Sequence, residues 1–222
     1  MKKSLKQQTE ALYQEYKSQV PAEIMNIIDR ATEELVETNI GHTCLQTGDR
    51  IPTFSLPDAY GQEVRVDELL AKGPLVVSFY RGGWCTFCNL ELKALQDHLE
   101  DIRSLGAELI AITPQQPDGT RSTLEELNIG YPILTDADNL VAQQFGLVFE
   151  VADELKPVYR EAFGLDIPKE NGNSSYELPV TATYVVDQSR NIVAAFTDPN
   201  FVNRFDPSDI LAAIPTVQER AS

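Results

Sequence analysis

Residues 74–92 read PLVVSFYRGGWCTFCNLEL, and this stretch determines the fold. Residues 74–80 form a nearly continuous apolar run, which is typical of a strand buried on both faces of a sheet. After the paired glycines, apolar side chains recur every three or four residues as far as Leu105, which predicts one long helix. Cys85 and Cys88 stand where this helix is expected to begin. The stretch therefore predicts a buried strand joined to a helix by a loop that carries a C-x-x-C pair.

The alternation of strands and helices continues on both sides of this unit. Gly106 is expected to end the helix, and 108–113 is the next buried strand; this order implies a right-handed crossover and parallel pairing. Further strands are expected at 51–56, 63–66, 131–135, 182–187 and 191–196, and further helices at 120–127, 139–145 and 207–214. We therefore predict an α/β domain over 45–222, with a central mixed sheet flanked by helices and an irregular insertion near 147–178.

Residues 1–44 have a different pattern and are expected to form a helical extension. Ser4 and Gln7 fit a capping box at the start of a first helix, and Pro21 suits the first turn of a second. The apolar residues of both segments recur at helical spacing. We expect a helical hairpin packed on the main domain, with a dimerisation arm as the alternative.

The composition of the chain excludes several classes of function. Its 222 residues include 34 acidic and 18 basic side chains, a net charge of −16, which disfavours binding to nucleic acids and to anionic membranes. No apolar run reaches about 18 residues, and the N-terminal lysines precede no apolar stretch, so we expect neither a membrane span nor a secretory signal. Three cysteines are too few for a disulfide-stapled secreted fold, which favours the reducing cytoplasm.

The position of the two cysteines favours chemistry at sulfur. Free N–H groups and the helix dipole stabilise a thiolate at a helix N-terminus by about 0.3–1 kcal/mol, and Arg81 can add to this. Cysteines at i and i+3 in a first helical turn are close enough to form a disulfide. The helical period places Cys88 on the inward stripe and Cys85 at the exposed tip, so we expect one sheltered and one accessible sulfur.

Two simpler interpretations of the cysteines are less favoured. Buried structural cysteines are common in cores, but they would not require this junction or the preceding glycines and Trp84. A metal site would combine Cys85 and Cys88 with His42 and Cys44, but the two pairs lie far apart in the sequence and His42 and Cys44 lack a usual ligand spacing. We therefore expect neither a metal nor another cofactor. His98 is expected at the surface of the long helix.

Residues 79–92 resemble the peroxiredoxin-like branch of the alkyl hydroperoxide reductase / thiol-specific antioxidant family. Segments 48–56, 178–187 and 198–201 are similar to its flanking elements, and the resemblance covers about 45–215. It implies a thioredoxin-like fold and a thiol peroxidase that reduces hydrogen peroxide and organic hydroperoxides. The implied electron donor is thioredoxin or a similar dithiol, and a homodimer is plausible for such a protein.

The chain departs from the family pattern P-x-x-x-T-x-x-C. Laid on this pattern, Cys88 takes the position of the peroxidatic cysteine, while Cys85 replaces the threonine and Arg81 the proline. The arginine that the family contributes from a later strand would fall near Thr181, where the chain has none. Thr181 also takes the place of the cis-proline that faces the cysteines in many thioredoxin-like folds.

The resemblance implies a thiolate that is oxidised by peroxide to a sulfenic acid, followed by a Cys85–Cys88 disulfide that a dithiol reduces. Alignment to the peroxiredoxin pattern favours Cys88 as the attacking thiol, whereas the expected exposure of Cys85 and the comparison with thioredoxin favour Cys85. Cys44 is expected to be an extra thiol, either inert or resolving. Two other functions remain as alternatives: a protein dithiol–disulfide oxidoreductase and a non-catalytic redox-sensing module.

Overall fold

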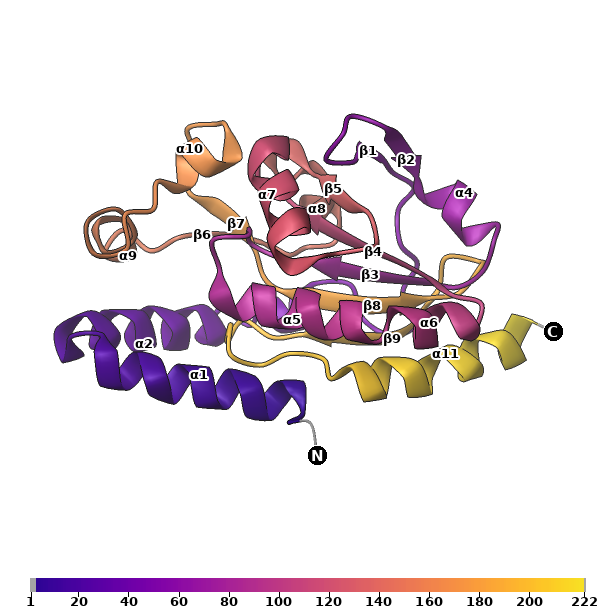
Figure 1. The fold of residues 1–222 in the computed structure, drawn as a ribbon, viewed down its shortest axis with the longest axis horizontal. Helices are drawn as coiled ribbons and strands as arrows, with labels where there is room; N and C mark the ends of the chain where they lie inside the picture. Colours follow the sequence, from indigo (N-terminus) through magenta and orange to yellow (C-terminus); the bar gives the residue numbers. More distant parts are fainter. Residues whose placement is uncertain (1–2, 222) are drawn as a thin grey trace.

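A five-stranded mixed sheet lies at the centre of the molecule, in the order β5-β4-β3-β8-β9 (Figure 1). The computed structural model describes residues 3–221, of which 215–221 are described by their backbone alone. The strands are β3 (Leu75–Phe79), β4 (Glu108–Thr113), β5 (Ile133–Thr135), β8 (Ala182–Val186) and β9 (Ile192–Thr197). β3, β4 and β5 run parallel, β8 is antiparallel to β3, and β9 is antiparallel to β8. The predicted α/β class, with a central mixed sheet, is confirmed.

β3 is the central strand, and all of its side chains are buried. On one face Phe79 packs against Phe145 and Tyr184, with ring centroids 4.8 and 6.3 Å away. On the other face Val76 belongs to an apolar cluster that contains Leu92 and both site cysteines. The apolar run of the sequence therefore serves two cores, one on each side of the sheet.

The helix predicted from the cysteines to Leu105 is interrupted, and this part of the prediction is wrong. α5 (Thr86–Asp97) ends directly before His98, and α6 (Leu99–Ser104) begins directly after it. His98 has φ −111° and ψ 10°, outside the helical range, and its Nδ1 lies 2.9 Å from the carbonyl oxygen of Ala94. The buried stripe continues across the break through Leu99 and Ile102, so the apolar period contains no sign of it.

The remaining helices cover both faces of the sheet. The apolar cluster on the Phe79 face of the sheet unites β3 with α4 (Val66–Leu70) and α8 (Leu140–Gln144). α8 follows the short 3-10 helix η1 (Ala137–Asn139). The opposite cluster unites β3 with α5, α6 and α11 (Pro207–Ala221), with α7 (Pro117–Leu127) packed at its edge. The predicted hairpin is present as β1 (Ser55–Pro57) and β2 (Glu63–Arg65). No helix within 3–221 is both long enough and apolar enough to cross a membrane.

The N-terminal residues form the expected helical hairpin, which lies along α5 (Figure 1). It consists of α1 (Leu5–Gln19) and α2 (Ala22–Glu37), followed by a short α3 (Ile40–Thr43) that the sequence pattern did not predict. The capping box forms as predicted: the Ser4 hydroxyl accepts from the Gln7 amide at 3.2 Å, and the Gln7 side chain accepts from the Ser4 amide at 3.1 Å. The Leu5 amide donates to Asp206 at 3.1 Å, which attaches α1 to the main domain.

The segment 147–178, expected as an irregular insertion, contains short elements around a small apolar cluster of its own. β6 (Val148–Glu150) pairs with β7 (Glu177–Pro179), and between them lie α9 (Leu155–Pro157), a π-helical turn η2 (Val158–Ala162) and α10 (Ile167–Asn171). Arg30 on α2 forms an ion pair with Glu154 next to α9. This segment and the N-terminal hairpin therefore contact one another.

Candidate active site

Cys85 is the N-cap residue of α5, directly after the loop that leaves β3. Its backbone is extended, with φ −90° and ψ 104°, so its sulfur faces the amides of the first helical turn. The Cys88 amide donates to Cys85 Sγ at 3.3 Å. The sulfur thus takes the place that a serine or aspartate oxygen has at most helix N-termini.

The two glycines before Trp84 allow the loop to pass close to its neighbours. A Cβ atom on Gly83 would lie 1.9 Å from the hydroxyl oxygen of Thr123, and one on Gly82 would lie 2.3 Å from Nε1 of Trp84. The Gly83 amide also donates to the Gln115 side chain at 2.8 Å. These contacts fix the loop, and with it the position of Cys85.

Cys85 and Cys88 are reduced and adjacent, with 2.6 Å between their Sγ atoms and the Cys88 thiol donating to Cys85. Both are buried: Cys85 is 4% exposed and Cys88 is 0% exposed. The prediction that Cys85 is an exposed tip is therefore wrong, because aromatic side chains from distant segments cover the helix N-terminus. The predicted pairing of the two sulfurs is consistent with this geometry, since a disulfide bond of about 2.05 Å needs only a small approach.

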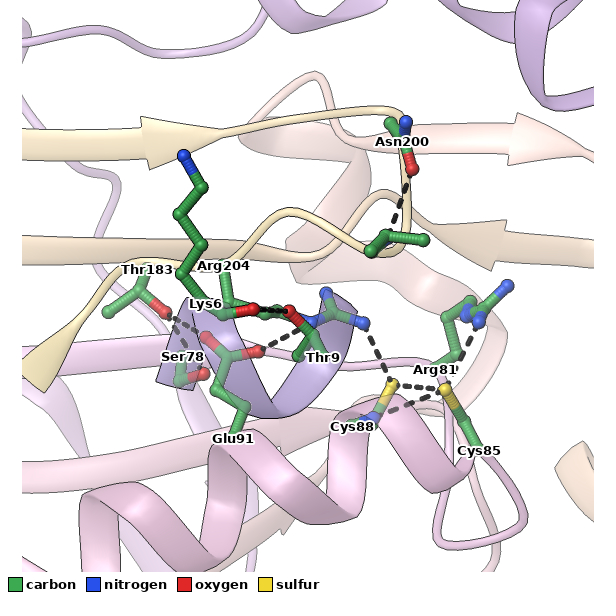
Figure 2. A network of polar contacts seen from close by, with 11 residues as sticks. Lys6, Thr9, Ser78, Arg81, Cys85, Cys88, Glu91, Thr183, Asn200 and Arg204 are labelled. Atoms are coloured by element: carbon green, nitrogen blue, oxygen red, sulfur yellow. Dashed lines mark hydrogen bonds and ion pairs between the residues drawn. The ribbon is translucent and has the colours of Figure 1, made fainter. Parts of the chain in front are cut away.

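Two arginines flank the sulfur pair, one on each side (Figure 2). Arg81 donates from Nη2 to Cys85 Sγ at 3.1 Å, and its guanidinium lies 5.6 Å from the ring centroid of Trp84 and 5.1 Å from that of Phe201. Arg204 approaches Cys88 Sγ with its Nη2 at 3.8 Å. The site therefore concentrates positive charge at the sulfurs within a chain of strongly negative net charge.

Arg204 is held by a buried carboxylate. Glu91, one turn after Cys88, has its Oε2 atom 3.4 Å from Arg204 Nε, and both side chains are almost fully buried. Thr183 on β8 donates to Glu91 at 3.0 Å, and its hydroxyl also lies 3.1 Å from that of Ser78 on β3 (Figure 2). Burial raises the pKa of Glu91, and the charge of Arg204 opposes that rise.

Sequence reasoning missed Arg204, which lies in the loop before α11. Nothing in its surroundings along the chain connects it with Cys88, which is 116 residues away. One indirect signal was present: Glu91 lies one turn after Cys88, on the inward stripe of the helix. A carboxylate on a buried helical face needs a cation or hydrogen-bond donors from another segment, and this requirement predicts a partner without identifying it.

The two thiols titrate in opposite directions. Burial alone would raise the pKa of Cys85, but the hydrogen bond from the Cys88 thiol, the charges of Arg81 and Arg204 and the Cys88 amide outweigh it, so the pKa of Cys85 lies well below its ordinary value. Burial raises the pKa of Cys88, and the hydrogen bond to the negative Cys85 sulfur raises it further. These opposite shifts favour ionisation of the Cys85 thiol before that of the Cys88 thiol.

Cys85 lines a cavity of about 460 Å³ that Cys88 does not reach. Its walls combine the loop and first turn of α5 with both N-terminal helices, the 147–178 segment and the loop after β9. The lining side chains outside the cysteine loop are mostly aromatic or aliphatic: Tyr13, Tyr16, Met25, Ile28, Phe87, Tyr159, Phe163, Leu165 and Phe201. Of the two site cysteines, Cys85 is therefore the one that a small molecule in the cavity can reach.

The other candidate residues lie away from the sulfur pair. Cys44 is buried in the apolar cluster on the opposite face of the sheet, where its thiol donates to the Gly41 carbonyl at 3.2 Å. Thr181 is buried beside a smaller cavity of about 200 Å³ and shares that lining with Arg81. Among the described residues, no three His, Cys, Asp or Glu side chains gather to hold a metal ion, so the alternative set with His42 is not assembled.

Comparisons with known proteins identify the family and the fold of the chain. The AhpC/TSA family model matches residues 47–195. Over 122 residues, 55% of this chain and 79% of the other, the chain is 31% identical to Rv1608c of Mycobacterium tuberculosis, whose name places it among the peroxiredoxins. It is 28% identical over 103 residues to peroxiredoxin Bcp of Escherichia coli, 46% of this chain and 65% of the other.

Solved structures share the fold at lower sequence identity. Peroxidoxin BcpB of Mycobacterium tuberculosis superposes with a TM-score of 0.61 at 22% identity, over 78% of this chain and 98% of the other. A mutant of peroxiredoxin 6 of Arenicola marina gives 0.63 at 18% identity, over 80% of this chain and 76% of the other. The thioredoxin-like fold that the sequence resemblance implied is thereby confirmed.

Proposed function

This chain belongs to the AhpC/TSA family and is a thiol-dependent peroxidase, and we propose that Cys85 attacks the peroxide while Cys88 resolves the product. The observation that carries this proposal is the direction of the hydrogen bonds at the sulfur pair. Cys85 Sγ accepts from Arg81, from the Cys88 amide and from the Cys88 thiol, as a thiolate does. Burial and the neighbouring Cys85 sulfur raise the pKa of Cys88, which favours its neutral thiol form.

Access to substrate supports the same assignment. Cys85 lines the 460 Å³ cavity, whereas Cys88 is completely buried behind it. In the family pattern the peroxidatic position falls on Cys88, so the proposal exchanges the two roles. The physical reason is the N-cap geometry, which gives the first cysteine of the pair the helix amides and the Arg81 guanidinium.

The reaction begins at the Cys85 thiolate. Its sulfur attacks the terminal oxygen of a hydroperoxide ROOH, an S–O bond forms and the O–O bond breaks. The leaving RO⁻ takes a proton from solvent and departs as the alcohol ROH, or as water when the substrate is hydrogen peroxide. Sulfur is oxidised to the sulfenic acid and the peroxide is reduced. Arg81 holds the thiolate before attack and stays beside the oxygen that sulfur gains.

Resolution and recycling follow at the same pair. The Cys88 thiol attacks the Cys85 sulfenic sulfur, an S–S bond forms, and water leaves. A dithiol such as thioredoxin then reduces the Cys85–Cys88 disulfide by exchange and becomes a disulfide itself. This cycle requires a reducing compartment, which fits the cytoplasm.

Single-turnover kinetics of two variants test the assignment. We expect Cys88→Ser to react with hydrogen peroxide and to stop at a sulfenic acid that a dimedone probe traps on Cys85. We expect Cys85→Ser to lose thiol no faster than free cysteine does. Cys44→Ser is the matched control and should behave as the unaltered chain. Rapid oxidation of Cys85→Ser at Cys88 would reverse the assignment. Slow oxidation of the unaltered chain would instead favour a protein dithiol–disulfide oxidoreductase.

A further inference from the structure

The cavity above Cys85 is built in part by segments outside the residues that the family model matches. The N-terminal hairpin, which precedes residue 47, contributes Tyr13, Tyr16, Met25 and Ile28. The loop after β9, which follows residue 195, contributes Phe201. These walls therefore lie outside the stretch that the family model matches, whereas the 147–178 segment lies within it.

The hairpin wall is fixed to the cysteine helix. The Tyr16 hydroxyl lies 2.8 Å from that of Thr86, the first residue of α5, and the Tyr16 ring lies 5.6 Å from the ring of Phe87. On the opposite side Phe87 contacts Phe201 edge-on, at 5.1 Å between ring centroids. The walls of the cavity are thus in place before any ligand enters, which lowers the entropy cost of binding.

The cavity is much larger than hydrogen peroxide requires. An apolar cavity of about 150 Å³ accommodates benzene, whereas this cavity has about 460 Å³. A molecule as small as hydrogen peroxide contacts only the sulfur and its immediate neighbours. An organic hydroperoxide of about ten carbon atoms would also cover the aromatic walls and remove their surface from water.

The charge of the lining selects among organic ligands. Arg81 is the charged side chain among those that line the described cavity, and its guanidinium is already directed at the Cys85 sulfur. Neither carboxylates nor ammonium groups are available in this lining for a charged substituent. A charge on the part of the ligand remote from Arg81 would therefore lose hydration without gaining a partner, whereas a neutral apolar body has no charge to desolvate.

We propose that the N-terminal hairpin and the 147–178 segment form a binding pocket that selects neutral hydroperoxides with a bulky apolar body over hydrogen peroxide. This inference rests on the proposed function, because the bound hydroperoxide is the one that Cys85 reduces. The preference is expressed as a lower KM, since the walls contact the body of the substrate and leave the O–O bond to the sulfur and Arg81.

Binding without chemistry is tested first, with the alcohol product as the probe. Trp84 is the only tryptophan of the chain and it lines the cavity, so its fluorescence reports on occupancy. The probe is 2-phenyl-2-propanol, the alcohol that reduction of cumene hydroperoxide would leave. In Cys85→Ser it should change this fluorescence with a saturable dependence on concentration. Phe163→Ala, which truncates a wall residue that is 41% exposed, should weaken the apparent affinity roughly tenfold. A response that does not saturate, or that is equal in both proteins, would overturn the proposal.

Steady-state selectivity is the second test and separates the two levels of inference. We compare kcat/KM for cumene hydroperoxide and for hydrogen peroxide, and expect the ratio to fall roughly tenfold in Phe163→Ala. Ile28→Phe, which fills the cavity from α2, should lower the ratio in the same direction. Tyr60→Ala, an equally aromatic but exposed residue outside the cavity, should leave the ratio unchanged. Rapid oxidation of Cys85 with an unaltered ratio would reject the pocket and keep the peroxidase, whereas slow oxidation by both peroxides would reject the peroxidase itself.

Discussion

The guanidinium group of Arg204 forms a buried ion pair with the carboxylate of Glu91, with 3.4 Å between Nε and Oε2. The Nη2 atom of the same guanidinium lies 3.8 Å from the sulfur of Cys88. One carboxylate on the cysteine helix therefore holds a cation against that helix from a loop near the other end of the chain. The pair links the stability of the protein to the electrostatics of its reactive sulfurs.

Breaking this pair should destabilise the protein more than removing it altogether. Arg204→Met leaves Glu91 without its cation, and Glu91→Gln leaves Arg204 without its anion; we expect each to lower the free energy of unfolding by about 3–5 kcal/mol. The double variant leaves neither charge unpaired and should lose less stability than either single variant. Urea unfolding of the four proteins measures this. Additive losses would show that the two side chains do not interact.

The rate of Cys85 oxidation should depend on pH in a way that Arg81 controls. Because the pKa of Cys85 lies well below its ordinary value, the thiolate persists as the pH falls below about 8.5, the usual thiol pKa. We therefore expect a rate constant that is still constant at the usual thiol pKa and that declines only at pH values well below it, as the thiolate gains a proton.

Arg81→Met removes the hydrogen bond and the positive charge at the Cys85 sulfur, so the decline should move to higher pH and the rate at neutral pH should fall. Stopped-flow oxidation over a pH series measures both effects. Arg103→Met, an ion-paired surface arginine on α6, is the control and should leave the profile unchanged. An identical midpoint in Arg81→Met and the unaltered chain would contradict the role given to Arg81.

Glycine at position 83 should be required for full stability because the Thr123 hydroxyl leaves no room for a side chain there. Gly83→Ala brings a methyl group against the Thr123 hydroxyl and should cost about 1–3 kcal/mol of stability. Thr123→Ala in the same protein should restore part of the loss, because the hydroxyl is the atom that obstructs. Gly130→Ala, where the nearest atom is 3.5 Å from the added carbon, serves as the control. Equal thermal unfolding of the single and double variants would reject this contact as the cause.

Local sequence patterns were sufficient for the elements that carry the site. The apolar run of β3 and the glycines after it predicted a strand, a loop and a helix N-terminus with Cys85 and Cys88 at the junction, and this junction is present. The break at His98 was missed because the buried stripe keeps its period across it. Helical spacing records which face is buried and is insensitive to a single residue whose backbone leaves the helix.

Long-range packing explains what the sequence pattern did not predict. Cys85 was expected to be exposed because it precedes the helix core, but Phe201 and the N-terminal helices cover it from distant parts of the chain. Arg204 was missed for the same reason, since its proximity to Cys88 arises only when the loop before α11 folds back over α5. Both errors concern contacts between segments, for which a single sequence contains no periodic signal.

Cys44 should take no part in the redox cycle, although it is a buried thiol within the same chain. It lies in the apolar cluster on the opposite face of the sheet, and its Cα packs against Gly146, so it cannot approach the sulfur pair without displacing the core. After one equivalent of hydrogen peroxide, intact mass should fall by about 2 Da, as one disulfide requires, and alkylation under denaturing conditions should label only Cys44. Cys44→Ser should form the same disulfide at the same rate. A mixed disulfide with Cys44, or a slower second phase that its substitution abolishes, would show that this thiol resolves the sulfenic acid.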